Sequence, residues 1–304
     1  MSDKKNLLIP VDFLPESESA LQYAVTIGKE LNATLHLLYI IEEESPLHRM
    51  VINNKQREMI RMGASDKLDE MAGKIISPTG MPFTTTVMQG KIYDQIIDAA
   101  QKVKADVILM GRTDSSDMKK NITGTNTMHI IKKAEVPVIT LRKKPYHPGC
   151  SHIILPLDLT KQTIRKASIA IVMANLLDAE VTVVSLLPGD RKSIEIKFIQ
   201  RLDEIRNTFE KLGVRCGVKL IPYTNKDPIK LLNDVVRELQ GDLVMIMTQQ
   251  ELNFSEFFIG SYAQEIINKS DFPVMSINPL TGEKDGIPDP MSDIFIDPIQ
   301  ILDH

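Results

Sequence analysis

The stretch from Gly111 to Thr125 (GRTDSSDMKKNITGT) has the residue types of a phosphate-binding loop. It follows an apolar run, Asp106–Met110, that is typical of a buried parallel strand, and a helix is predicted to start at Gly124 and Thr125. A helix start offers unpaired backbone N–H groups and a positive dipole end to an anion, and glycine lets the backbone approach it closely. The same residues also make ordinary turns, so a plain connecting loop is an alternative at this point.

Strands and helices are predicted to alternate through the first half of the chain. The expected strands are Asn6–Val11, Thr34–Ile41, Phe83–Met88, Asp106–Met110 and Val136–Leu141, and the expected helices are Glu16–Leu31, about Asn53–Ile76, Ile92–Val103 and Thr125–Lys133. This alternation predicts a parallel α/β sheet with right-handed crossovers. In such a sheet ligands sit outside the carboxyl ends of the strands, where Asp12, Ile40 and the glycine loop should meet.

The pattern then restarts. The sequence Leu155–Leu159 (LPLDL) repeats Ile9–Phe13 (IPVDF), so Asp158 matches Asp12. Three later landmarks also repeat: Asp242 matches Asp106, Gly260 matches Gly124, and Pro273 matches Pro137. We therefore interpret the chain as a tandem duplication.

The expected fold is two doubly wound α/β domains, each with a five-stranded parallel sheet and helices on both faces, related by a pseudo-two-fold. The domains are predicted at 1–143 and 151–280, joined by a linker at 144–150 and followed by an acidic tail at 281–304. The tail is either solvated or docks its apolar residues, Ile294–Ile296 and Ile299–Ile301, on a sheet edge or a partner.

Each half resembles a universal stress protein domain, an adenine-nucleotide-binding module of the adenine-nucleotide alpha hydrolase-like fold. The family's loop reads glycine, two residues, glycine, nine residues, then glycine followed by serine or threonine. The first half has Gly111, then Asp114 in place of the second glycine, then Gly124 and Thr125. The Pro10-Val11-Asp12 opening also resembles the family.

The resemblance implies a ligand and a role for each matching residue. The ligand is ATP or another adenine nucleotide, with Mg or Mn bound through the phosphates. The implied nucleotide-binding residues are Pro10, Val11, Asp12, Ile40, Gly111, Asp114, Gly124, Thr125, Asn126 and Thr127. Asp12 would bond the base or ribose, Ile40 would line the adenine slot, and Gly111 would let the ribose and phosphates approach. A helix N-cap is the alternative role for Asp12.

Asp114 and the second half depart from the family pattern. A carboxylate about 4 Å from a phosphate charge opposes it by roughly 4 kcal/mol at an effective dielectric near 20, so Asp114 must be offset or turned away. Arg112, Lys119 and Lys120 could offset it; alternatively, Asp114 could help to ligate a cation bound to the phosphates. In the second half, Met247 and Gln250 replace the first two glycines. The equivalent positions there are Asp158, Leu186, Gly260 and Ser261. We expect triphosphate binding in this half to be lost or much weaker.

The composition and the net charge limit the kinds of partner that are expected. A net charge of −4 gives no case for nucleic acid or an anionic membrane, and no stretch approaches the ~20 apolar residues of a membrane span. Two cysteines without framework spacing fit a reducing compartment, so the cytoplasm is expected. The six histidines lack metal-ligand spacing, and the methionines of Asn53–Ile76 (Met59, Met62 and Met71) are expected in packing.

The leading hypothesis is a nucleotide-responsive stress protein that binds ATP mainly in its first half and signals to an unknown protein partner. The two halves are expected to pair with each other as separate subunits do, and a homodimer of the whole chain is also possible. No nucleophile with a paired base and no Walker lysine is evident, so no enzyme is expected beyond slow ATP hydrolysis. One alternative is an interaction scaffold that binds no nucleotide; another, an adenylating enzyme, needs a pyrophosphate-loop motif that is not evident.

Overall fold

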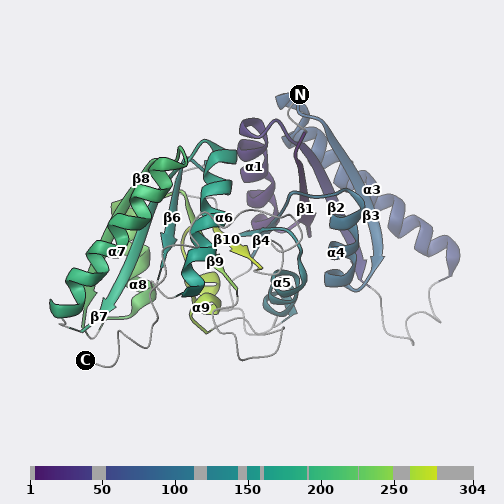
Figure 1. The fold of residues 1–304 in the computed structure, drawn as a ribbon. Coiled ribbons are helices and arrows are strands. Elements are labelled where there is room, and N and C mark those ends of the chain that lie inside the picture. The colour runs from purple at the N-terminus through teal and green to yellow at the C-terminus, as the bar shows by residue number, and fades with distance from the viewer. Residues whose placement is uncertain are drawn as a thin grey trace. The chain divides into compact units, whose positions relative to one another are not determined.

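The computed structural model describes residues 4–42, 53–112, 122–142, 149–157, 161–189, 192–224, 226–248 and 261–278. The chain divides into two compact units, Met1–Lys144 and Pro145–His304, called unit 1 and unit 2 below. In each unit helices and strands alternate along the chain (Figure 1).

Unit 1 contains a parallel sheet with the strand order β3-β2-β1-β4-β5. Its elements are β1 (Asn6–Val11), α1 (Pro15–Glu30), β2 (Thr34–Glu42), α3 (Asn54–Ile75), the 3-10 helix η1 (Ser77–Thr79), β3 (Phe83–Gly90), α4 (Ile92–Lys102), β4 (Val107–Gly111), α5 (Ile122–Lys133) and β5 (Val138–Leu141). The chain runs outward from β1 to β3 and returns to β4 on the other side of β1. The strand order therefore switches between β1 and β4.

Unit 2 repeats this topology, with parallel strands in the order β8-β7-β6-β9-β10. Its elements are β6 (His152–Pro156), α6 (Lys161–Leu177), β7 (Glu180–Pro188), α7 (Lys192–Lys211), β8 (Cys216–Tyr223), α8 (Pro228–Glu238), β9 (Leu243–Met247), α9 (Ser261–Lys269) and β10 (Val274–Ile277). The predicted α/β fold with parallel sheets is confirmed.

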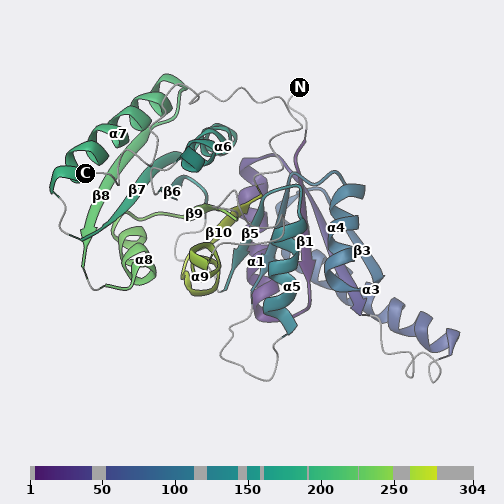
Figure 2. The ribbon, with the colours of Figure 1, turned by 60° about the horizontal axis from the view of Figure 1, so that its bottom comes forward.

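Right-handed crossovers place the helices of each unit on two faces. In unit 1, α1 and α3 share one face and α4 packs with α5 on the other; in unit 2, α6 and α7 share one face and α8 packs with α9 (Figure 2). The central strands are covered on both sides, which is why Leu7, Leu8 and Ile9 of β1 are all buried.

An aspartate before the fourth strand of each unit fixes the start of the first strand. Asp106 accepts a hydrogen bond from the Asn6 backbone N–H at 2.8 Å and pairs with Lys5 Nζ at 3.1 Å. The equivalent Asp242 is buried, and its Oδ2 accepts the Ser151 N–H at 3.0 Å, the Ser151 hydroxyl at 2.7 Å and the His152 N–H at 3.0 Å. The sequence repeat marked both aspartates without indicating this role.

Three predicted boundaries were wrong. The third strand, expected to end at Met88, continues to Gly90. The helix expected from Thr125 begins at Ile122, so Gly124 and Thr125 lie within its first turn. The fifth strand begins at Val138 instead of Val136, since Pro137 has no N–H to give to a strand ladder. No helix in the described part of the chain is long and apolar enough to span a membrane.

Candidate functional site

The predicted site residues of unit 1 come together at the carboxyl edge of its sheet. Val11 pairs with Tyr39 across β1 and β2, so the next residues, Asp12 and Ile40, stand level with each other. On the other side of β1, Leu8 pairs with Ile108, and the same register brings Gly111 level with Val11. Asp12 and Gly111 therefore flank the switch between β1 and β4, where open α/β sheets bind ligands.

Asp12 shapes the turn between β1 and α1. Its Oδ1 accepts the Leu14 N–H at 3.0 Å, and its own backbone N–H donates to the Ser17 hydroxyl at 3.3 Å. The N-cap of α1 is Leu14, with no capping side chain, so Asp12 is not the helix cap. Asp12 is exposed and ends a buried strand. A carboxylate in this place is free to face a ligand.

Gly111 has a packing role that the sequence did not indicate. A Cβ built on Gly111 would lie 2.4 Å from both the carbonyl carbon and the carbonyl oxygen of Glu16 and 2.6 Å from the Ser17 nitrogen. These are backbone atoms of the first turn of α1, which cannot yield as a side-chain tip can. Gly111 therefore lets α1 approach β4 closely, whether or not it also faces a nucleotide.

The start of α5 supplies the remaining predicted residues. The backbone N–H of Gly124 belongs to the first turn, where intrahelical partners are lacking, and Thr125 follows it. Asn126 is half-buried and Thr127 is buried. Asp114 lies outside the described residues, as do Lys119 and Lys120.

Arg112 lies at the same edge. The sequence indicated only that its charge could offset the charge of Asp114. Arg112 directly follows β4, is 6% exposed, and donates its backbone N–H to the Leu141 carbonyl at 2.8 Å. Its guanidinium places a positive charge near this edge. Only the tertiary structure reveals this burial.

Two of the four equivalent positions of unit 2 lie in the described part of the chain. Leu186 is half-buried on β7 and Ser261 begins α9, but Asp158 and Gly260 lie outside the described residues. Met247 ends β9 where Gly111 ends β4, and it is 3% exposed. The glycine of unit 1 is thus replaced by a buried thioether side chain.

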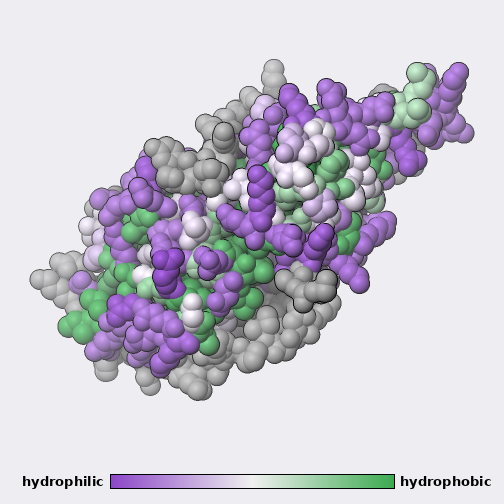
Figure 3. All heavy atoms as spheres, turned by 90° about the horizontal axis from the view of Figure 1, so that it is seen from above, coloured by the Kyte–Doolittle hydropathy of each residue, from purple (hydrophilic) through white to green (hydrophobic). Residues whose placement is uncertain are grey.

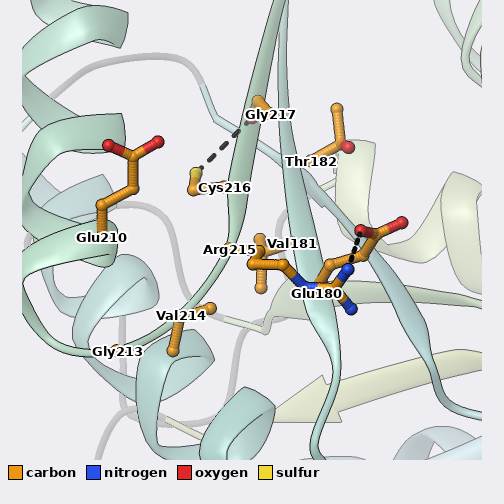
Figure 4. Close-up of a pocket in the computed structure, with 9 residues that line it drawn as sticks. All are labelled: Glu180, Val181, Thr182, Glu210, Gly213, Val214, Arg215, Cys216 and Gly217. Carbon is orange, nitrogen blue, oxygen red and sulfur yellow. Dashed lines mark hydrogen bonds and ion pairs between the residues drawn. The ribbon is translucent and has the colours of Figure 1, made fainter.

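A hollow of about 590 Å³ lies at the opposite, amino edge of the unit 2 sheet (Figure 4). Glu180 and Arg215 pair there at 3.7 Å, and Glu210 of α7 lines the other side. Burial, aided by the charge of Glu210, raises the pKa of the Cys216 thiol to about 12, so it is not a nucleophile near neutral pH. Among the described residues no His, Cys, Asp or Glu cluster could hold a metal ion.

Comparison with known proteins shows which proteins the chain resembles. Residues 4–142 match the model of the universal stress protein family. The first half of the chain is thus similar to universal stress proteins. A universal stress protein of Methanocaldococcus jannaschii is 26% identical over 142 residues, covering 46% of this chain and 82% of that protein.

Two solved universal stress proteins of Archaeoglobus fulgidus are also similar. One, 17% identical, covers 90% of this chain and 96% of its own with a TM-score of 0.66, which shows that the fold is shared across both units. Another, solved in complex with dAMP, is 24% identical over 41% of this chain with a TM-score of 0.34. At that score the likeness does not place a ligand in this chain.

Proposed function

We propose that unit 1 binds an adenine nucleotide, ATP in the first place, at the carboxyl edge of its sheet. The observation that carries this proposal is the register that sets Asp12 and Ile40 level on one side of the strand switch and Gly111 beside them. The first turn of α5 follows β4, and N–H groups in the first turn of a helix, which have no intrahelical partner, suit phosphate. The buried Arg112 adds a positive charge at this edge.

Each residue then has a task. Asp12 accepts a hydrogen bond from the ribose or base, Ile40 gives apolar surface to adenine, and Gly124, Thr125 and Thr127 bind phosphate. A divalent ion, Mg or Mn, is held by the phosphates themselves, and when bound it neutralises part of their charge. Pro10, Val11 and Asn126 complete the surroundings of the nucleotide.

Nucleotide binding serves regulation in this proposal. The ligand bridges the end of β1 and the start of α5, so its presence changes the surface that a protein partner meets. We assign no catalytic step beyond slow ATP hydrolysis. We place the protein in the cytoplasm, where its two buried cysteines, which form no disulfide, stay reduced. Unit 2 binds nucleotide weakly or not at all, because Met247 occupies the position of Gly111.

The test compares one carboxylate in each unit. Asp12→Asn keeps an oxygen that accepts the Leu14 N–H, so the turn survives while the charge is lost. We expect titration calorimetry with Mg-ATP to show binding weakened by about tenfold or more, as expected for a lost hydrogen bond to a charged group. The matched control is Asp158→Asn, which should leave affinity unchanged.

Two results would overturn the proposal. One is a wild-type protein that neither carries nucleotide after purification nor binds millimolar ATP, ADP, AMP or dAMP. The other is an equal loss of affinity in the two variants, which would remove the distinction between the units. The first result favours the scaffold function, which the Met247 replacement already favours for unit 2.

A further inference from the structure

Helix α3 extends well beyond the sheet that it covers. Its second half packs on β2 and β3 through the buried Leu68 and Ala72, but every residue from Asn53 to Gly63 is exposed. Figures 1 and 2 both show this end of the helix projecting from unit 1. Two of the three methionines expected in packing are exposed instead, 64% for Met59 and 58% for Met62, whereas Met71 is half-buried. Among the described residues of unit 1, the first half of α3 therefore has no packing partner.

The projecting half of α3 nevertheless has a capped N-terminus. The Asn53 side chain accepts the Gln56 N–H at 2.9 Å, and the Gln56 side chain accepts the Asn53 N–H at 3.0 Å, which is a complete capping box. About three unpacked turns are marginal in water even when capped. Apolar side chains on such a segment indicate that it has a packing partner elsewhere.

Four residues form a stripe on the solvent face of α3: Lys55, Met59, Met62 and Asp66. Their spacing of four, three and four residues is that of a coiled-coil seam. Met59 precedes the buried Leu68 by nine residues, or two and a half turns, so this seam points away from the sheet. In Figure 3 the projecting end is hydrophilic except for a pale green area. Among the described residues, neither Lys55 nor Asp66 forms an ion pair.

The seam of one copy is complementary to the seam of a second copy that runs in the opposite direction. We propose that α3 is a self-association surface, on which the α3 helices of two copies pair antiparallel across a two-fold axis. Met59 of each copy then packs against Met62 of the other, and Lys55 of each faces Asp66 of the other. The helix pair thus has two layers of paired methionines at its centre and one layer of opposite charges at each end.

Only the antiparallel orientation makes these charge contacts. It sets Lys55 against Asp66 in both outer layers, whereas parallel pairing in register sets Lys55 against Lys55 and Asp66 against Asp66. Gly63 adjoins the seam, and a Cβ built there would meet nothing within 4 Å, so a second helix can approach closely.

One helix pair buries little area, so the dimer should be weak. Interfaces below about 1,200 Å² are typical of transient association, and we expect a dissociation constant of tens of micromolar. The charged layers should also make association weaken as salt rises.

The test is a charge swap read by sedimentation velocity on the full chain, from about 1 to about 200 μM. Lys55→Glu alone, or Asp66→Lys alone, puts like charges in both outer layers and should weaken association at least about tenfold. The double variant Lys55→Glu/Asp66→Lys restores opposite charges and should restore the wild-type constant. Met59→Glu/Met62→Glu should abolish association.

The matched control is Ile60→Glu, which removes another exposed apolar residue, 48% exposed, from the side of the helix. It should leave association unchanged, and far-ultraviolet circular dichroism should confirm that every variant keeps its helices. A wild type that stays monomeric throughout, a double swap that fails to restore association, or a control as damaging as the methionine variant would each overturn the proposal. So would binding of α3 to anionic vesicles without self-association.

Discussion

Gly111 ends β4 in unit 1, and Met247 ends β9 at the equivalent place in unit 2. In unit 1 the first turn of α1 approaches so closely that no side chain fits, and α1 lies along β4. In unit 2 the side chain is present and buried, and α6 contacts β9 only sparsely. The same fold thus accommodates two positions of the first helix relative to the fourth strand, according to whether that strand ends in glycine. The difference falls at the edge where a nucleotide is proposed to bind.

The largest expected effect comes from giving unit 1 a side chain at this position. Gly111→Ala places a methyl group 2.4 Å from the Glu16 backbone, and we expect the free energy of unfolding to fall by about 3 kcal/mol. Urea unfolding followed by circular dichroism measures this. The control is Gly73→Ala in α3, where a Cβ meets nothing within 4 Å and removal of a helix glycine should stabilise by about 0.5–1 kcal/mol. Equal midpoints for the two variants would show that the close approach is not maintained in solution.

A second comparison sharpens the contrast between the repeated aspartates. Asp242→Ala removes a buried carboxylate and leaves the partly buried Ser151 and His152 N–H groups without their acceptor, which should cost about 2–3 kcal/mol. Asp106→Ala removes a partly exposed carboxylate and should cost about 1 kcal/mol. Thermal unfolding of the two variants tests the order, and a larger loss for Asp106→Ala would refute the explanation by burial.

The smallest effect concerns the starts of α8 and α4, which are equivalent helices. Asp227 caps α8 by accepting the Ile229 N–H at 2.9 Å, and this hydrogen bond holds the pKa of the carboxyl below its usual value. Lys91, at the same place before α4, makes no such bond. Asp227→Ala should therefore lower the urea midpoint slightly, whereas Lys91→Asp should stabilise by about 0.5–1 kcal/mol.

The pH dependence of the Asp227 effect has a definite sign. A lowered pKa means that the folded protein favours the charged carboxylate, so the contribution is fully present above the usual carboxyl pKa. It is lost as the pH falls through the lowered value. The difference in midpoint between wild type and Asp227→Ala should then vanish in strongly acidic buffer, and a difference that grows on acidification would contradict this cause.

Much of the fold was predictable because its signals are local. Apolar runs of five to nine residues set the strands, and helical spacing set α1 and α4 within one or two residues of their observed ends. The boundary of α5 was missed because Gly124 was taken to mark a helix start, whereas the helix begins at Ile122. The repeat and the family's loop pattern together placed Asp12, Ile40 and Gly111 at one edge.

The sequence by itself determined the order of the elements, the repeat, and the residues gathered at the carboxyl edge, because periodicity and motif spacing are properties of neighbouring residues. The tertiary structure decided what those residues contact. It assigned Gly111 to the packing of α1, Arg112 to a buried place, Asp106 and Asp242 to the starts of distant strands, and Met59 and Met62 to an exposed helix face. These roles depend on segments up to about a hundred residues apart, and only the folded chain brings such segments together.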